Sequence, residues 1–161
     1  MGRINKEDRR QTAVYGDMRR ESRAMWNENN DCVVMAIALA CNIPYSAVHQ
    51  ALNAQGRKNG KGTWGYQWTK ALKELGIETE IVRPSDFIKQ YPKGHCDKLK
   101  NVTTHHMDRF PNVWKDGHNY LLHTRQHMGA VVDGVNHDWT KGRACRVDMI
   151  YRINIAILPV N

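Results

Sequence analysis

Residues 32–41 form an apolar run, Cys-Val-Val-Met-Ala-Ile-Ala-Leu-Ala-Cys, which limits how this 161-residue chain can fold. On a helix these side chains leave almost no polar face, so most of the segment must be covered by other parts of the protein. Pro44 follows closely and stops the helix. We therefore expect a buried helix over residues 32–41, of which only the N-terminus needs to reach solvent.

Cys32 begins this helix and follows the polar turn Asn30-Asp31. The Asp31 carboxylate is expected to cap the helix. The unpaired N–H groups and the positive end of the helix dipole favour a thiolate over a thiol at this position. Cys32 is therefore a candidate nucleophile, whereas Cys41, at the apolar end of the same helix, is expected to be structural.

Positive charge is concentrated near the start of the chain. There are 24 Lys and Arg residues against 16 Asp and Glu residues, a net charge of +8. We interpret residues 1–25 as a basic arm and residues 26–161 as a single domain. The arm is either a solvated terminus or a contact surface for an acidic partner or nucleic acid. The arginines that would make that contact are Arg9, Arg10, Arg19 and Arg20.

The cysteines indicate a reducing compartment. Cys32, Cys41, Cys96 and Cys145 are widely spaced, and no apolar signal segment precedes them. The longest apolar run is too short to cross a membrane. We therefore expect a cytoplasmic protein with free thiols and no membrane partner.

The remaining pattern predicts helices first and an antiparallel sheet afterwards, which is typical of an α+β domain. Expected helices cover residues 45–54 and Thr63 to Leu75, with Trp64 and Trp68 as core or cleft wall. A strand at residues 77–82 and one or two helical turns at residues 85–91 follow. Residues 92–119 are polar and are interpreted as a long loop or insertion near a functional face. The C-terminal strands are expected at residues 120–124, 127–132, 135–139 and 145–158.

Two of these strands form a hairpin that carries a histidine and a carboxylate. If Asp133-Gly134 is a two-residue turn, the pairing places Gly129 opposite Asp138. His127 then lies two residues further along the same face. This diagonal separation is short enough for a histidine and an aspartate to interact.

The order of these features resembles the papain-like cysteine peptidase superfamily. In that superfamily the nucleophile begins a buried N-terminal helix, the histidine lies on a later strand, and an Asn or Asp lies on the next strand. The chain is most similar in style to small bacteriocin-processing domains and to phage-encoded proteins of this size. The resemblance covers roughly residues 26–158 and rests on the Asn-Asp-Cys helix start and on the His127–Asp138 hairpin.

The resemblance implies a role for each matching residue. Cys32 would be the nucleophile, His127 the general base and acid, and Asp138 the group that orients His127 and stabilises its charged form. Residues of the same types stay open as alternatives: His123 and His137 for the base, and Asp133, which suits the tight turn better, for the acid.

The superfamily also uses a Gln or Asn shortly before the nucleophile to hold the oxyanion. Here that window contains no glutamine, and Asn27 is the preferred donor with Asn30 as the alternative. The backbone N–H of Cys32 is expected to contribute in either case. The chemistry implied by the resemblance needs no metal or other cofactor.

A metal site in the insertion is a competing interpretation. His95-Cys96 and His105-His106 supply four ligands of the kind that zinc prefers, but their spacing does not match a familiar zinc finger. A histidine-rich loop without a metal is the alternative.

The sequence thus predicts a small thiol hydrolase that attacks an amide carbonyl, most naturally in a protein or peptide substrate. The cluster of Trp64, Tyr66 and Trp68 is expected to border its cleft, and the positive charge is expected to favour acidic substrates. The alternative function is a catalytically silent papain-like module that binds a host protein or nucleic acid through its basic arm.

Overall fold

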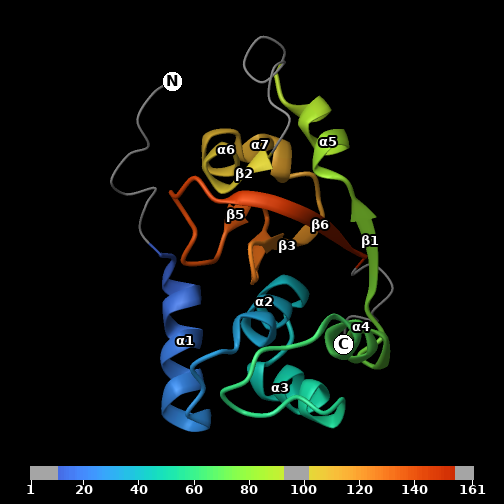
Figure 1. Ribbon diagram of the computed structural model, residues 1–161. Helices are drawn as coiled ribbons and strands as arrows, with labels where there is room; N and C mark the ends of the chain where they lie inside the picture. Colours follow the sequence, from blue (N-terminus) through green and yellow to red (C-terminus); the bar gives the residue numbers. More distant parts are fainter. Residues whose placement is uncertain (1–10, 93–101, 155–161) are drawn as a thin grey trace.

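The computed structural model describes residues 11–92 and 102–154 and has a mixed α+β fold in which an antiparallel sheet lies between two groups of helices (Figure 1). The sheet has six strands in the order β1-β6-β3-β4-β5, and β2 also pairs with β6. In chain order the elements are α1 (Ala13–Trp26), α2 (Cys32–Cys41), α3 (Tyr45–Ala54), α4 (Gly65–Glu74), β1 (Glu78–Val82), α5 (Pro84–Phe87), the 3-10 turn η1 (Ile88–Gln90), β2 (Val102–Thr103), α6 (Thr104–Arg109), α7 (Pro111–Trp114), β3 (Asn119–Thr124), β4 (His127–Val132), β5 (Val135–Asn136) and β6 (Arg146–Asn154).

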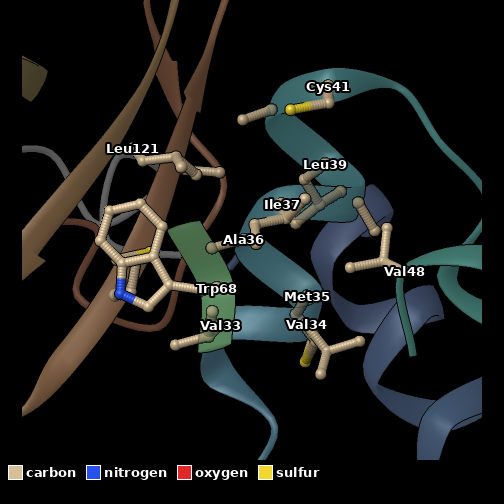
Figure 2. Close-up of a cluster of buried hydrophobic side chains, with 14 of the residues drawn as sticks. Val33, Val34, Met35, Ala36, Ile37, Leu39, Cys41, Val48, Trp68 and Leu121 are labelled. Atoms are coloured by element: carbon tan, nitrogen blue, oxygen red, sulfur yellow. The ribbon is translucent and has the colours of Figure 1, made fainter. Parts of the chain in front are cut away.

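Helix α2 is the apolar segment predicted from the sequence, and every residue after Cys32 is buried. Strands β3 and β4 and helix α3 contact it. Trp68 and Leu121 lie on one side of the helix and Val48 on the other (Figure 2). The helix ends at Cys41, and its cap residue Asn42 adopts a left-handed conformation with φ 52°. The expected Asp31 cap is wrong, because the Asp31 carboxylate accepts a hydrogen bond from the Tyr45 hydroxyl at 2.6 Å and makes none to the first turn.

Helices cover both faces of the sheet. Successive side chains along a strand point to opposite faces, and the central strands carry apolar side chains on both. On β3, Leu121 belongs to the cluster around α2, whereas Tyr120 and Leu122 belong to a second cluster that includes residues of α5, α6 and α7. On β4, Ala130 and Val131 divide in the same way. The face of β4 that carries Ala130 therefore lies against α2, and this packing sets the distance between the thiol and the hairpin.

The packed part of the chain begins earlier than residue 26. Helix α1 starts after Thr12, whose hydroxyl accepts a hydrogen bond from the Tyr15 N–H at 3.4 Å. Tyr15 is 5% exposed and belongs to the core cluster around α2. Thr12 also bonds His137 across 2.6 Å, which ties the start of α1 to the far end of the chain.

Residues 102–114, within the expected loop or insertion at 92–119, contain β2, α6 and α7, so the prediction of a long loop is wrong there. Met107 and Trp114 are almost fully buried, and the Trp114 indole donates to the Tyr91 hydroxyl at 3.0 Å. Short helices with one or two buried residues each carry too little periodicity to stand out among polar neighbours.

Smaller differences concern where elements begin and end. Helix α4 starts at Gly65 with Trp64 as its cap residue, so Thr63 is not the cap; the Gln67 side chain accepts from the Trp64 N–H at 2.8 Å. Strand β5 is only two residues long, because the chain turns away after Asn136. In the part of the chain that the structure describes, no helix has the length and apolar character needed to cross a membrane.

Replacing Ile37 by Ala tests how strongly α2 holds the fold. Ile37 is 0% exposed, so the substitution should lower the free energy of unfolding by about 2–5 kcal/mol through lost burial and a residual cavity. Denaturant unfolding measures the change. Val14→Ala is the control, because Val14 is 55% exposed and its truncation should alter stability by less than about 0.5 kcal/mol. Equal effects of the two substitutions would contradict the described packing.

Candidate active site

Cys32 lies half-buried at the N-terminus of α2, and the segment before it is held on two sides. The Arg57 guanidinium donates to the Asn30 carbonyl at 3.2 Å. Tyr45, on α3, holds the Asp31 carboxylate as described above. These contacts fix the polar turn, so the direction in which the thiol leaves the helix is set by groups outside the helix itself.

A buried ionic cluster supports the same turn. Glu28 bonds Arg57 at 2.5 Å and His49 at 2.9 Å, and it accepts the Gly60 N–H at 2.7 Å. Burial opposes the charge on Glu28, but these hydrogen bonds outweigh it and hold the pKa of Glu28 below its ordinary value. Removing one member of such a cluster leaves an unpaired buried charge, so the cluster is a fixed support rather than a mobile switch.

The hairpin forms with the predicted register. Asp133 and Gly134 have φ values of 50° and 78°, which a two-residue turn of this kind requires. Val131 pairs with Asn136 before the chain leaves the sheet. A Cβ built on Gly129 would lie 3.0 Å from the Asp138 Cγ, so the absence of a side chain at residue 129 makes room for that carboxylate.

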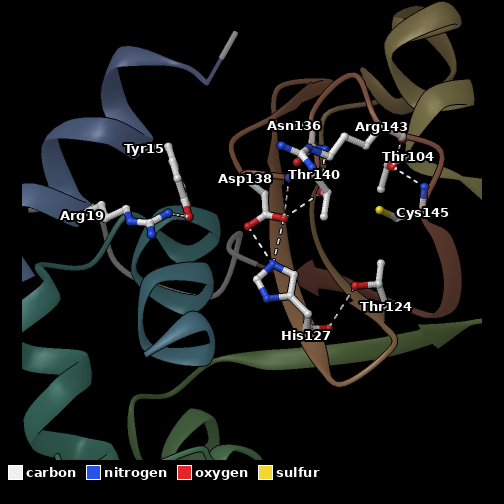
Figure 3. A network of polar contacts seen from close by, with 10 residues as sticks. All are labelled: Tyr15, Arg19, Thr104, Thr124, His127, Asn136, Asp138, Thr140, Arg143 and Cys145. Atoms are coloured by element: carbon white, nitrogen blue, oxygen red, sulfur yellow. Dashed lines mark hydrogen bonds and ion pairs between the residues drawn. The ribbon is translucent and has the colours of Figure 1, made fainter. Parts of the chain in front are cut away.

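His127 and Asp138 form a tight pair at the base of this hairpin (Figure 3). The His127 Nε2 lies 2.9 Å from both carboxylate oxygens. Asp138 is itself held, because the Thr140 hydroxyl donates to it at 2.6 Å and the Thr140 N–H at 3.2 Å. The carboxylate is 3% exposed, so it can orient the ring without competition from bulk water. Because this bond uses Nε2, Nδ1 is the ring nitrogen that remains for a contact with the thiol.

Cys32 is hydrogen-bonded to the His127 side chain and to the backbone N–H of Met128. Burial opposes ionisation of the thiol, but these two hydrogen bonds outweigh it, and the pKa of Cys32 lies below its ordinary value. Burial also opposes the charge on His127, but the hydrogen bonds to Asp138 and Cys32 raise the pKa of His127 to about 9. Both shifts favour a thiolate next to an imidazolium.

The structure brings together Cys32, His127 and Asp138, the three residues predicted to act as a triad. Asn30 lies beside Cys32 and lines the same cavities. Asn27 does not line those cavities. It ends α1 in a left-handed conformation, is exposed, and donates its N–H to the Arg23 carbonyl at 3.2 Å. Its position makes Asn30 the better-placed side-chain amide of the two.

The competing residues have other surroundings. His137 bonds Thr12, and burial lowers the pKa of His137. His123 lines part of the cleft, but the thiol bonds to His127. Asp133 is in the turn, with its carboxylate 3.9 Å from the Lys115 ammonium. Burial raises the pKa of Cys41 to about 12, so that thiol is held neutral.

Three residues near the thiol were not singled out from the sequence. Tyr15, on α1, lines two of the cavities at Cys32, and burial raises the pKa of its hydroxyl. Gln126 comes directly before His127 in the β3–β4 turn, and it lines the two larger cavities at Cys32. The Trp139 ring centroid lies 5.0 Å from that of His127. Of the three, only Gln126 and Trp139 could have been selected from the sequence, because each is adjacent to a predicted triad residue.

Two larger cavities meet at Cys32 and form the cleft around the thiol, and a third, of about 10 Å³, shares Cys32 and His127 with them. The larger, of about 500 Å³, is lined by Trp64 and Trp68, as predicted, whereas Tyr66, which was also expected at the cleft, does not line it. The smaller, of about 180 Å³, lies under α1 and contains Arg19 and Arg23. Asn30, Cys32, Gln126 and His127 line both.

The predicted metal alternative has no support in the described residues. Within residues 11–92 and 102–154 no group of three His, Cys, Asp or Glu side chains is placed to hold a metal ion. His95 and Cys96 lie outside these ranges, as do Arg9 and Arg10 of the basic arm. Comparisons with protein-family models, with curated proteins and with solved structures found no match.

Asp138→Asn tests the part that the carboxylate plays. Without its negative charge the pKa of His127 should fall, the thiolate should lose its charged partner, and alkylation of Cys32 by iodoacetamide near pH 6 should slow about tenfold, the effect of one pKa unit. Peptide mass spectrometry measures the rate at Cys32. Asp133→Asn is the matched control, because Asp133 is an exposed hairpin carboxylate that does not contact His127. Unchanged alkylation in Asp138→Asn would refute this role.

Proposed function

We propose that this protein is a cysteine-dependent amide hydrolase with Cys32 as nucleophile, His127 as acid and base, and Asp138 as orienting group. The observation that carries the proposal is the continuous chain of contacts from the Cys32 thiol through His127 to a buried carboxylate. A lowered pKa and an adjacent base that a third group orients both activate a cysteine nucleophile, and both features support the proposal.

In the proposed reaction the Cys32 sulfur attacks the carbonyl carbon of a bound amide and forms a C–S bond. The C–N bond breaks as the His127 imidazolium gives its proton to the leaving amine. Water then attacks the thioester carbon, His127 takes the water's proton, and the acid product leaves with Cys32 regenerated. Asp138 stabilises the charged ring in the steps that require it.

The developing oxyanion needs donors close to the sulfur. The first N–H groups of α2 have no partner one turn earlier, and the N–H of Cys32 is among them. The side-chain amides of Asn30 and Gln126 are the candidates for a second donor, because both line the cavities at Cys32. A donor after the nucleophile in the sequence, such as Gln126, would differ from the order expected from the papain-like resemblance.

The papain-like assignment is part of the same proposal. Its support is the order of parts: a thiol at the start of a buried helix, a histidine at the start of β4 and a carboxylate after β5, with α2 packed on an antiparallel sheet. The free thiols of Cys32, Cys41 and Cys145 suit a reducing compartment such as the cytoplasm.

The alternative function is a catalytically silent module that binds a host protein or nucleic acid through the basic arm. Of its arginines within the described residues, Arg20 forms an exposed ion pair with Asp17, and Arg19 donates to Tyr15 and lines the cleft at Cys32. The described part of the arm therefore supports a role next to the thiol, and we retain hydrolysis as the proposed function.

The test is cleavage of a complex peptide mixture, with products identified by mass spectrometry. Cys32→Ala should reduce product formation by at least about a thousandfold, because it removes the group that forms the acyl-enzyme. Cys145→Ala is the matched control, since Cys145 is also a half-buried free thiol but lies outside the two cavities at Cys32. Cleavage that survives in Cys32→Ala would defeat the proposal, as would a wild-type protein that cleaves no peptide.

A further inference from the structure

The two cavities that meet at Cys32 have opposite chemical character. We call the larger one, lined by Trp64, Trp68 and Tyr151, the aromatic side. We call the smaller one, lined by Arg19 and Arg23, the arginine side. Any extended substrate whose reacting carbonyl lies at Cys32 passes the junction between them, so its neighbouring residues meet different walls.

The arginine side carries positive charge without matching carboxylates. Among the residues that the structure describes, neither Arg19 nor Arg23 forms an ion pair; Arg19 donates only to the Tyr15 hydroxyl, at 3.4 Å (Figure 3). Of the described residues that line this cavity, only Asp31 carries a carboxylate, and the Tyr45 hydroxyl already bonds it. Guanidinium groups bind carboxylates in planar, two-point geometry, so two unpaired ones beside a reacting thiol select an anionic group.

A neighbouring cavity adds further arginine side chains to the surroundings of the arginine side. It shares His127 and Trp139 with the arginine side, and the exposed Arg125 lines it. Arg146 lines it too and is paired with Asp148 at 3.4 Å. Charges of one sign around a cleft attract the opposite charge before contact is made, so this arrangement also steers an acidic segment towards the site.

The aromatic side is both rigid and exposed. Trp68 and Tyr151 pack edge to face with centroids 4.9 Å apart, which fixes one wall. Trp64, at the start of α4, is 70% exposed, which is unusual for a side chain of this size. An exposed tryptophan beside a buried aromatic pair offers a surface on which an aromatic or large apolar residue can stack.

We infer that the substrate is a polypeptide segment with an acidic residue on one side of the reacting amide and an aromatic residue on the other. This inference rests on the proposed function for the location of the reacting amide. It adds that Arg19 and Arg23 recognise the carboxylate and that Trp64 recognises the aromatic ring.

Protection of Cys32 from alkylation tests the inference without requiring turnover. Short peptides that contain Glu and Trp on either side of a central amide, in both orders, compete with iodoacetamide for access to Cys32. One order should protect at about tenfold lower concentration than its Glu→Gln counterpart, since one charge contact in a partly desolvated cleft is worth about one decade in affinity. Replacing the peptide's Trp by Ala should weaken protection about threefold to tenfold.

Matched variants assign each preference to its residues. Arg19→Ala combined with Arg23→Ala should erase the Glu preference, whereas Arg20→Ala, on the same helix but paired with Asp17, should retain it. Trp64→Ala should erase the Trp preference, whereas Tyr66→Ala should retain it, because Tyr66 is 60% exposed and lines neither cavity.

Equal protection by Glu and Gln peptides, or by Trp and Ala peptides, would overturn the inference. A preference that persists in the arginine or tryptophan variants would overturn it as well. Alkylation measured without peptide separates this result from the proposed function: if His127→Ala slows it, the Cys–His pair stands even when the peptide preferences are absent. Labelling of Cys32 as an ordinary thiol, indifferent to His127, would instead defeat the proposed function.

Discussion

The packing of α2 against β4 is the contact on which the site depends. It buries a helix with almost no polar face, and the same contact brings the helix N-terminus to the start of the strand. Cys32 thereby meets His127 and the N–H of Met128. The apolar residues that give the fold its stability therefore also set the separation of the reacting groups, and a thiol at any other position of α2 would be buried.

The electrostatics of the site then determine the protonation states of Cys32 and His127. Burial alone would keep the thiol and the imidazole neutral, and it is the largest single influence on each. The hydrogen bonds that join Cys32, His127 and Asp138 reverse that effect at both groups. The polar turn before Cys32 is held by Arg57 and Tyr45, so the arrangement does not rely on the helix end alone. The charged pair is a property of the assembled site and not of any one residue.

Much of this could be predicted from local patterns. The run at residues 32–41 has no polar face, so its burial followed from composition. Asp133-Gly134 selects a two-residue turn, and the period of two along a strand then places Asp138 across from Gly129. These predictions succeeded because a turn type or a periodicity leaves few alternatives.

The features that sequence could not supply depend on contacts between distant segments. Tyr15 reaches the site because α1 is tied to His137 by Thr12, more than a hundred residues away in the chain. Asn27 was the preferred oxyanion donor because of its spacing from Cys32. It is instead the cap residue at the end of α1, where its backbone N–H bonds carbonyls of that helix. Asp31 was expected to cap α2, yet Tyr45 offered its carboxylate a better-placed donor. Tertiary partners thus determine the positions of Tyr15 and of the Asp31 carboxylate, whereas the local cap of α1 determines that of Asn27.

The most direct test of the central claim is a pH titration of the Cys32 thiolate by its ultraviolet absorbance, with Cys32→Ala as the blank and His127→Ala for comparison. Cys32 is predicted to ionise below the ordinary thiol pKa of about 8.5. His127 should stay protonated until the pH approaches about 9. In His127→Ala the pKa of Cys32 should rise to the ordinary value or above, because burial then raises it without the opposing hydrogen bond to His127. A Cys32 that ionises as an ordinary thiol, with the same pKa in both proteins, would contradict the account.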